Sequence, residues 1–255
     1  MNRSPSRFLL INNNNSRTKF ALASAQGLIE HRVMETREVD RSGVDALVAG
    51  WHFDQIVLAS VVPARAEVLR RCFELPLVEV SARINLGVQV DFPQPETVGA
   101  DRLANAAAVA SRVSERPCIV VDFGTAVTFD IVVPGPAYIG GVIAPGLDVM
   151  REYLHQRTAL LPLIDLEEPP SAIGRSTEHA MLSGAVHGYR GLVREILQQV
   201  SAELRDRLRL PALPQLVATG GHAGLISAGL PEIGSVEPFL TMDGLLQIGL
   251  LHFPS

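Results

Sequence analysis

The fold is decided by the stretch Asp122-Phe123-Gly124-Thr125-Ala126-Val127-Thr128-Phe129-Asp130. Apolar residues 118–122 predict a strand, Gly124-Thr125 predicts a turn, and residues 127–133 predict the returning strand. Gly124 permits a close approach of the backbone to a ligand, and the Thr125 hydroxyl can bond a phosphate. An ordinary hairpin with a polar turn is the alternative for D-x-G-T alone, but the longer pattern has few chance matches.

The chain on either side of this stretch predicts two similar α/β units. Each unit begins with strands joined by tight turns and continues with helices, which favours mixed sheets covered by helices. We place the first domain at residues 1–114 and the second at residues 115–255. Strands are predicted at 8–11, 19–24, 28–35, 55–62, 77–80, 118–122, 127–133, 138–143 and 216–219, and helices at 44–51, 64–73, 101–113, 149–156, 177–208 and 242–252.

Composition narrows the class of protein. Of the 255 residues, 47% are hydrophobic and 19% are charged, and the mean hydropathy is +0.22, which excludes a disordered chain. The net charge of −5 lacks the basic footprint of a nucleic-acid-binding protein. The apolar run 8–11 is too short for a signal peptide, and no stretch approaches the ~18 apolar residues of a membrane span. Cys72 and Cys118 lack metal-ligand spacing, so we expect reduced cysteines in a cytoplasmic protein that binds neither nucleic acid nor membrane.

The polar turns of the two opening hairpins predict phosphate binding. The first turn is Asn12-Asn13-Asn14-Asn15-Ser16, and the second is Gly124-Thr125. Backbone N–H groups in tight turns can cradle phosphate. With one such turn in each unit, we expect a cleft between the units that holds a nucleoside triphosphate.

A candidate base lies in Gly99-Ala100-Asp101-Arg102. Asp101 opens the predicted helix, where the helix dipole favours its charged form, and it can accept a proton from a substrate hydroxyl. Arg102 can hold a carboxylate or phosphate through two parallel bonds. The alternative is a plain helix cap beside a solvated arginine.

Two glycine pairs add weaker signals. Gly140-Gly141 inside a predicted strand indicates a close approach by another backbone or a ligand, or else a simple bulge. Thr219-Gly220-Gly221 follows a strand and precedes a possible helix, a common place for the base or ribose of a nucleotide.

In this order and spacing, these segments resemble the type III pantothenate kinases over nearly the whole chain. The resemblance implies two ribonuclease H-like domains, the fold of actin-like ATPases, with a nucleotide cleft between them. It implies transfer of the ATP γ-phosphate to pantothenate, which gives 4′-phosphopantothenate and begins coenzyme A synthesis. It also implies Mg²⁺, a monovalent cation (K⁺ or NH₄⁺) and a homodimer.

The resemblance also implies the roles of individual residues. Asp101 corresponds to the general base, and Asp122 corresponds to the ligand of the monovalent cation. Pantothenate contacts are implied for Phe92, Gly99, Ala100, Asp101, Arg102 and Thr177. ATP contacts are implied for Asn12, Asn13, Asn14, Asn15, Ser16, Arg17, Thr18, Lys19, Thr125, Thr219, Gly220 and Gly221.

Three residues depart from the family pattern. The first phosphate motif of the family reads D-x-G-N-T-x-x-K; Asn12 replaces its Asp and Asn14 its Gly, whereas Lys19, the only lysine of the chain, matches. An amide oxygen is a weaker Mg²⁺ ligand than a carboxylate. Phe92 stands where the family usually has Tyr. The alternatives are therefore a catalytically impaired paralogue that binds or regulates, or a kinase of this fold with another small hydroxyl substrate.

Overall fold

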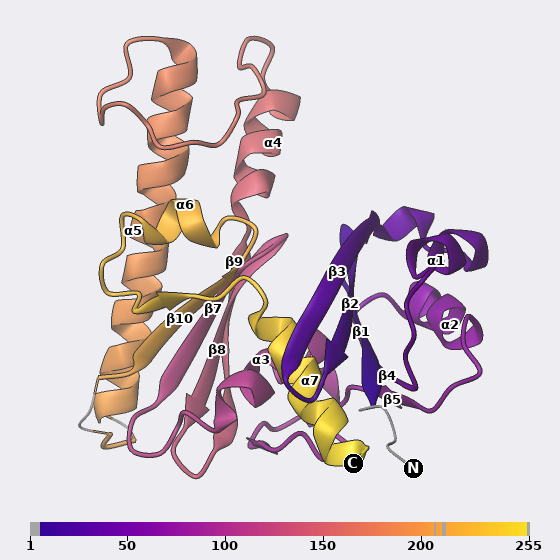
Figure 1. The fold of residues 1–255 in the computed structure, drawn as a ribbon. Helices are drawn as coiled ribbons and strands as arrows, with labels where there is room; N and C mark the ends of the chain where they lie inside the picture. Colours follow the sequence, from indigo (N-terminus) through magenta and orange to yellow (C-terminus); the bar gives the residue numbers. More distant parts are fainter. Residues whose placement is uncertain (1–5, 207, 211–212, 254–255) are drawn as a thin grey trace. The chain divides into compact units, whose positions relative to one another are not determined.

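The computed structural model describes residues 6–206, 208–210 and 213–253 (Figure 1). The chain forms two compact units: residues 1–114, 135–140 and 239–255 make unit 1, and residues 115–134 and 141–238 make unit 2. Residues 135–140 and 239–255, which the predicted boundaries assign to the second domain, group with unit 1. Predictions for residues 1–5 and for Arg207 lie outside the described residues.

Unit 1 is built on a five-stranded sheet of order β3-β2-β1-β4-β5. The antiparallel strands are β1 (Arg7–Asn13), β2 (Arg17–Ser24) and β3 (Gly27–Glu35), and the parallel strands β4 (Gln55–Ser60) and β5 (Leu77–Glu79) follow β1. The centre of β1 is fully buried, as its continuous apolar run predicts. The β1–β2 register places Asn12 opposite Lys19.

The helices of unit 1 are α1 (Arg41–Leu47), α2 (Pro63–Arg71), α3 (Ala100–Ala110) and α7 (Leu240–His252), with short 3₁₀ turns at Thr36–Glu38 and Pro95–Thr97. Helix α7, yellow in Figure 1, packs on α3, β1 and β4. The two helices approach closely because a side chain at Gly244 would overlap the Ala104 carbonyl. Thr241 Oγ1 donates a buried 2.8 Å hydrogen bond to Asn105 Oδ1. These contacts explain why α7 belongs to unit 1.

The second sheet has the order β11-β10-β7-β8-β9-β6. Strands β7 (Cys118–Phe123) and β8 (Ala126–Val133) form the hairpin predicted around Gly124-Thr125. β9 runs from Ala137 to Pro145, and the parallel strand β10 (Gln215–Gly220) lies on the other side of β7. The two-residue strands are β6 (Gln89–Val90), which pairs with the start of β9 in unit 1, and β11 (Ser235–Val236).

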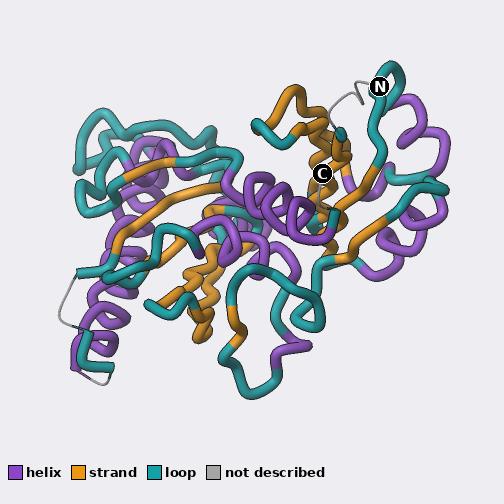
Figure 2. The backbone as a smooth tube through the Cα atoms, turned by 60° about the horizontal axis from the view of Figure 1, so that its bottom comes forward, coloured by secondary structure: helices purple, strands orange, loops and turns teal. Residues whose placement is uncertain are grey.

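Unit 2 contains α4 (Leu147–Arg157), α5 (Thr177–Asp206) and the short α6 (Ala223–Ser227). Figure 2 separates these helices (purple) from the strands (orange). Ser176 caps α5 as predicted, because its Oγ accepts a 3.2 Å hydrogen bond from the His179 N–H. Cys72 and Cys118 are both buried, and burial raises the pKa of Cys72.

Among the described residues, none of the helices combines the length and the apolar character that crossing a bilayer requires.

Candidate active site

The asparagine-rich turn lies between β1 and β2 in unit 1. Asn13 is fully buried and serves the fold: its Nδ2 donates to Thr18 Oγ1 at 2.7 Å, and its Oδ1 accepts from Ser60 Oγ at 2.6 Å. Thr18 Oγ1 in turn lies 3.0 Å from Thr36 Oγ1. The side chains of Asn13 and Thr18 are therefore engaged inside the protein, although the sequence places both in the ATP segment.

Asn12 and Asn14 differ from Asn13 in having unsatisfied oxygens. Asn12 is 3% exposed, and the Oδ1 atoms of both residues are buried without a hydrogen-bond partner. Such an atom is costly unless a ligand, ion or water satisfies it. Amide oxygens are hard ligands that suit Mg²⁺, so this end of β1 fits a cation or the water bound to it.

The remaining residues of the turn face solvent. Asn15, Ser16 and Arg17 are exposed, and the turn is closed by the Asn14 N–H, which donates to the Arg17 carbonyl at 3.2 Å. Lys19, on β2, lies directly across from Asn12 in the strand register and adds a positive charge to this end of the hairpin. An exposed turn next to a cation is suited to bind phosphate.

Asp101 lies in the first turn of α3, and Gly99 is the residue before the helix. The Arg102 N–H donates to Asp101 Oδ1 at 2.9 Å. Asp101 is half-buried, and loss of solvent raises the pKa of its carboxyl above the usual value, against the lowering by that hydrogen bond and by the Arg102 charge. A carboxylate with a raised pKa is a stronger proton acceptor, so the geometry supports a base here.

Two neighbouring aromatic rings lie near Arg102 in unit 1. The Arg102 guanidinium lies 5.8 Å from the centroid of the Tyr138 ring, and the rings of Phe92 and Tyr138 are 6.4 Å apart. Gly140 has φ +119°, and a side chain there would begin 3.3 Å from the Phe92 ring. The group that approaches Gly140 is therefore the side chain of Phe92, whereas the paired glycines predicted another backbone or a ligand.

Unit 2 brings together the carboxyl ends of β7 and β10. Thr219 pairs with Asp122, and Gly220 pairs with Phe123. Gly220 has φ +94°, and a side chain there would begin 2.6 Å from Asp122 Oδ1. The backbone of Gly220 thus lies against the carboxylate of Asp122, and only glycine fits this position.

The other predicted residues of unit 2 differ in exposure. Thr125 and Gly221 are exposed, and Thr219 is buried. Thr177 is exposed at the first position of α5. The structure therefore joins Asp122 with Thr219 and Gly220 in one cluster, and it places Thr125 at an exposed position of the β7–β8 turn.

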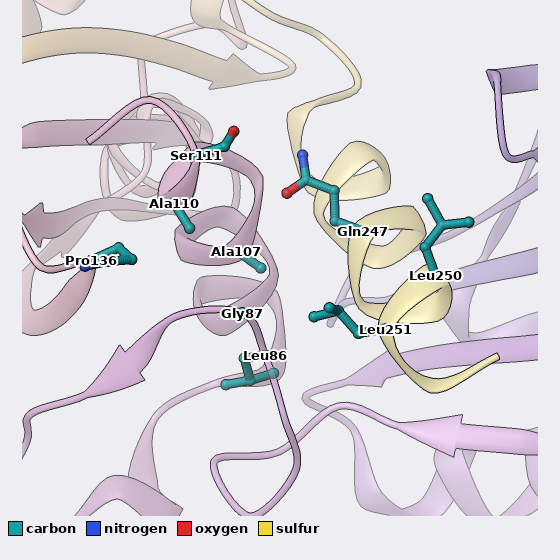
Figure 3. Close-up of a pocket in the computed structure, with 9 residues that line it drawn as sticks. All are labelled: Leu86, Gly87, Ala107, Ala110, Ser111, Pro136, Gln247, Leu250 and Leu251. Carbon is teal, nitrogen blue, oxygen red and sulfur yellow. The ribbon is translucent and has the colours of Figure 1, made fainter. Parts of the chain in front are cut away.

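A cavity of about 370 Å³ lies elsewhere in unit 1, between the end of α3 and α7 (Figure 3). None of the residues predicted to bind substrate or nucleotide lines it. Its walls are mainly apolar and consist of Leu86, Gly87, Ala107, Ala110, Ser111, Pro136, Gln247, Leu250 and Leu251. Within the described ranges, no group of three or more His, Cys, Asp or Glu side chains could hold a metal ion.

Two residues near the site were missed from the sequence. Tyr138 contacts both Phe92 and Arg102 through its ring, and its place in a buried strand gave no sign of this. His222 directly follows Thr219-Gly220-Gly221, and its Nε2 lies 2.8 Å from Asp148 Oδ2. Its position next to the glycine pair was the available signal.

Comparisons with known proteins show what this chain is similar to. A family model for type III pantothenate kinases matches residues 8–199. The chain is 50% identical to a type III pantothenate kinase of Akkermansia muciniphila, covering 93% of this chain and 96% of the relative. It is 36% identical to a type III pantothenate kinase of Methylacidiphilum infernorum, covering 94% and 87%.

Solved structures share the fold at low identity. A protein described as a Baf family transcriptional activator, from Campylobacter jejuni, matches with a TM-score of 0.62 and 17% identity over 96% of this chain and 98% of that one. A protein described as a 2-dehydro-3-deoxygalactonokinase, from Sinorhizobium meliloti, matches with a TM-score of 0.59 and 13% identity over 97% and 100%. These likenesses confirm the predicted α/β fold of the actin-like ATPases.

Proposed function

Because this chain belongs to the type III pantothenate kinase family, we propose that it transfers the γ-phosphate of ATP to the hydroxyl of pantothenate. The product is 4′-phosphopantothenate, and the reaction begins coenzyme A synthesis. The observation that carries this proposal is the Asp101 carboxylate, which lies at the start of α3 beside Arg102 and has a raised pKa.

In the proposed reaction, Asp101 takes the proton of the pantothenate hydroxyl. The hydroxyl oxygen forms a bond to the γ-phosphorus while the bond from that phosphorus to the bridging oxygen of ADP breaks. Phosphoryl transfer depends mainly on positioning and charge stabilisation, and one carboxylate suffices to orient or deprotonate the attacking group. Unit 1 supplies this residue.

We assign ATP contacts in each unit. Unit 1 contributes residues 12–19, where Lys19 and the exposed turn favour phosphate, and where Asn13 and Thr18 act by shaping the turn. Unit 2 contributes the exposed Thr125 hydroxyl to phosphate and Thr219-Gly220-Gly221 to adenosine. Thr219 is buried, so its part is to position the loop.

Side-chain oxygens of both units are suited to bind the metal ions of the proposed reaction. The unsatisfied Oδ1 atoms of Asn12 and Asn14 would hold Mg²⁺ or its bound water, and Asp122 would hold K⁺ or NH₄⁺. Bound cations neutralise the negative charge of the phosphates. Asn12 carries no charge, so we expect weaker Mg²⁺ binding than a carboxylate would give.

Pantothenate is assigned to unit 1 and to the start of α5. Arg102 can pair with the pantothenate carboxylate, and Gly99 and Ala100 present backbone at the start of α3. Phe92 packs beside Gly140, and Thr177 offers an exposed hydroxyl.

The proposal includes a homodimer in the cytoplasm. Exposed apolar side chains on α4 support a self-association surface: Val149, Met150, Tyr153 and Leu154. On α5, Gly184, Gly188 and Gly191 are exposed and have no heavy atoms near the place a side chain would take. The buried thiols of Cys72 and Cys118 fit a reducing compartment.

The test is ADP formation by the purified chain with ATP, Mg²⁺ and K⁺, with and without pantothenate. We expect turnover that requires pantothenate and is lost in Asp101→Asn. Absence of turnover in folded protein, at high ATP and with either K⁺ or NH₄⁺, would favour the impaired paralogue. ADP formation with other small alcohols only would favour a different substrate.

A further inference from the structure

Three turns of unit 2 pack against one another where β7, β9 and β10 end (Figure 1). The β7–β8 turn contacts the β9–α4 turn, since the Gly146 N–H donates to the Thr125 carbonyl at 3.2 Å and a side chain at Gly146 would overlap that oxygen. The β7 end also contacts the β10–α6 turn, where Gly220 lies on Asp122. The backbone thus links both neighbouring turns to the segment that contains Asp122 and Thr125.

A side-chain contact closes this ring of turns. His222 stands between Gly221 and α6, and its Nε2 lies 2.8 Å from Asp148 Oδ2 in the first turn of α4. An ionised carboxylate only accepts hydrogen bonds, so the His222 Nε2–H is the donor of this bond. His222 therefore joins the adenosine segment of the proposed function to the helix that follows Gly146.

The Asp148 carboxylate is itself held in place. Its Oδ1 lies 3.2 Å from Arg151 Nη2, so each of its oxygens faces a different donor. The His222 main chain is fixed too, because its N–H donates to the Phe123 carbonyl at 3.4 Å and its carbonyl accepts from the Ile226 N–H at 3.0 Å. With both ends anchored, the bond between them restricts where Gly220 and Gly221 can lie.

We infer that His222 is a positioning residue for ATP, held by Asp148, which keeps Thr219-Gly220-Gly221 in its binding conformation. This rests on the proposed assignment of that segment to adenosine. A loop ordered before binding loses less conformational freedom when the ligand binds, which strengthens affinity. The expected effect falls on ATP rather than on pantothenate, because Thr219-Gly220-Gly221 is assigned to adenosine and to no pantothenate contact.

The experiment measures the Kd of a non-hydrolysable ATP analogue by calorimetry for the wild-type chain, His222→Ala, Asp148→Ala and the double variant. We expect each single variant to raise the Kd about two- to fivefold, the range for a partly exposed polar pair. The double variant should raise it no further than the larger single effect, because both residues act through one bond. His222→Gln, whose amide can still donate to Asp148, should recover most of the affinity.

The control is Arg194→Ala, which breaks the 3.0 Å ion pair with Glu232 in the same unit and should leave the Kd unchanged. In turnover, His222→Ala should raise the KM for ATP and leave the KM for pantothenate unchanged, a split that general loss of stability would not give. If His222→Ala does not fold, Asp148→Ala and Asp148→Asn make the same comparison.

An unchanged Kd in His222→Ala, or additive effects in the double variant, would overturn the inference. The proposed function would survive that result if the wild-type chain phosphorylates pantothenate. Conversely, a wild-type chain that binds the analogue without phosphorylating pantothenate contradicts the proposed function and leaves the binding comparison valid.

Discussion

Gly99 leaves the space that the carboxylate of Asp101 occupies: a side chain at position 99 would begin 2.7 Å from Asp101 Oδ1. The neighbouring Val61 methyl lies at 3.5 Å, so the carboxylate is the closer obstacle. Asp101 Oδ1 also accepts the Arg102 N–H at 2.9 Å. Gly99 thus allows the carboxylate of Asp101, the proposed base, to take this orientation.

Gly99→Ala should lower kcat by about tenfold or more, because the displaced carboxylate no longer lies where it can accept the substrate proton. The thermal stability should change little, since a short side chain can turn aside more easily than backbone can shift. Steady-state kinetics and thermal denaturation check both parts. Unchanged kcat in Gly99→Ala would mean that the orientation of Asp101 is not set by this contact.

Asp101→Asn should lower kcat about 10²–10⁴-fold, the usual contribution of a general base. It should also raise the free energy of unfolding at neutral pH. Burial raises the pKa of Asp101 in the folded chain, so its ionisation opposes folding as the pH rises from the ordinary value of 3.8 through the raised value. The stability gain should therefore vanish below that ordinary value, where the carboxyl is protonated in both states.

Denaturant unfolding of Asp101→Asn and the wild-type chain at several pH values checks the predicted difference in stability. Equal stability of Asp101→Asn and the wild-type chain from acid to neutral pH would show that the carboxylate is not destabilised by burial. The rate of the wild-type enzyme should likewise rise with pH through the raised pKa of Asp101, because only the ionised form accepts a proton.

Asn12→Asp should lower the Mg²⁺ concentration that gives half-maximal rate by about tenfold, since a carboxylate is a stronger ligand than an amide oxygen. The new charge is buried, so without metal the variant should be less stable than the wild-type chain unless Lys19, opposite in the β1–β2 register, compensates it. Added Mg²⁺ should then raise its melting temperature more than that of the wild-type chain. An Mg²⁺ dependence shared by both proteins would place the metal away from Asn12.

Phe92→Tyr should lower the KM for pantothenate about three- to tenfold, which corresponds to one net hydrogen bond. The ring already packs beside Gly140 and Tyr138, so the change adds a hydroxyl to a fixed ring. The KM for ATP serves as the internal control and should not move. A higher KM for pantothenate would indicate that the hydroxyl crowds the site.

The local elements were predictable because their signals are local. The apolar run of β1, the turn at Gly124-Thr125 and the Ser176 cap each appear where the sequence predicts them. Strands β6 and β11 have two residues each, too few to show any periodicity. The unit to which α7 belongs was not predictable, because the contact of Gly244 with Ala104 joins residues far apart in the sequence.

In the candidate site, too, the residues in local motifs were predictable, and the contacts between distant residues were not. Asp101, Asp122 and Thr125 are recognisable because each lies in a short motif at the end of a strand or the start of a helix. The burial of Asn13 could not be predicted, because four asparagines in a row indicate an exposed turn. Only the structure shows that the Asn13 side chain is hydrogen-bonded to Thr18 and Ser60. The partnership of His222 with Asp148 spans two turns that only the sheet brings together.

The proposed reaction is tested by mass spectrometry of the products formed from ATP and pantothenate in the presence of Mg²⁺ and K⁺. The proposed function predicts one 4′-phosphopantothenate for each ADP released, with both products formed about 10²–10⁴-fold more slowly by Asp101→Asn. ADP without phosphopantothenate, or phosphopantothenate formed equally by Asp101→Asn, would contradict it.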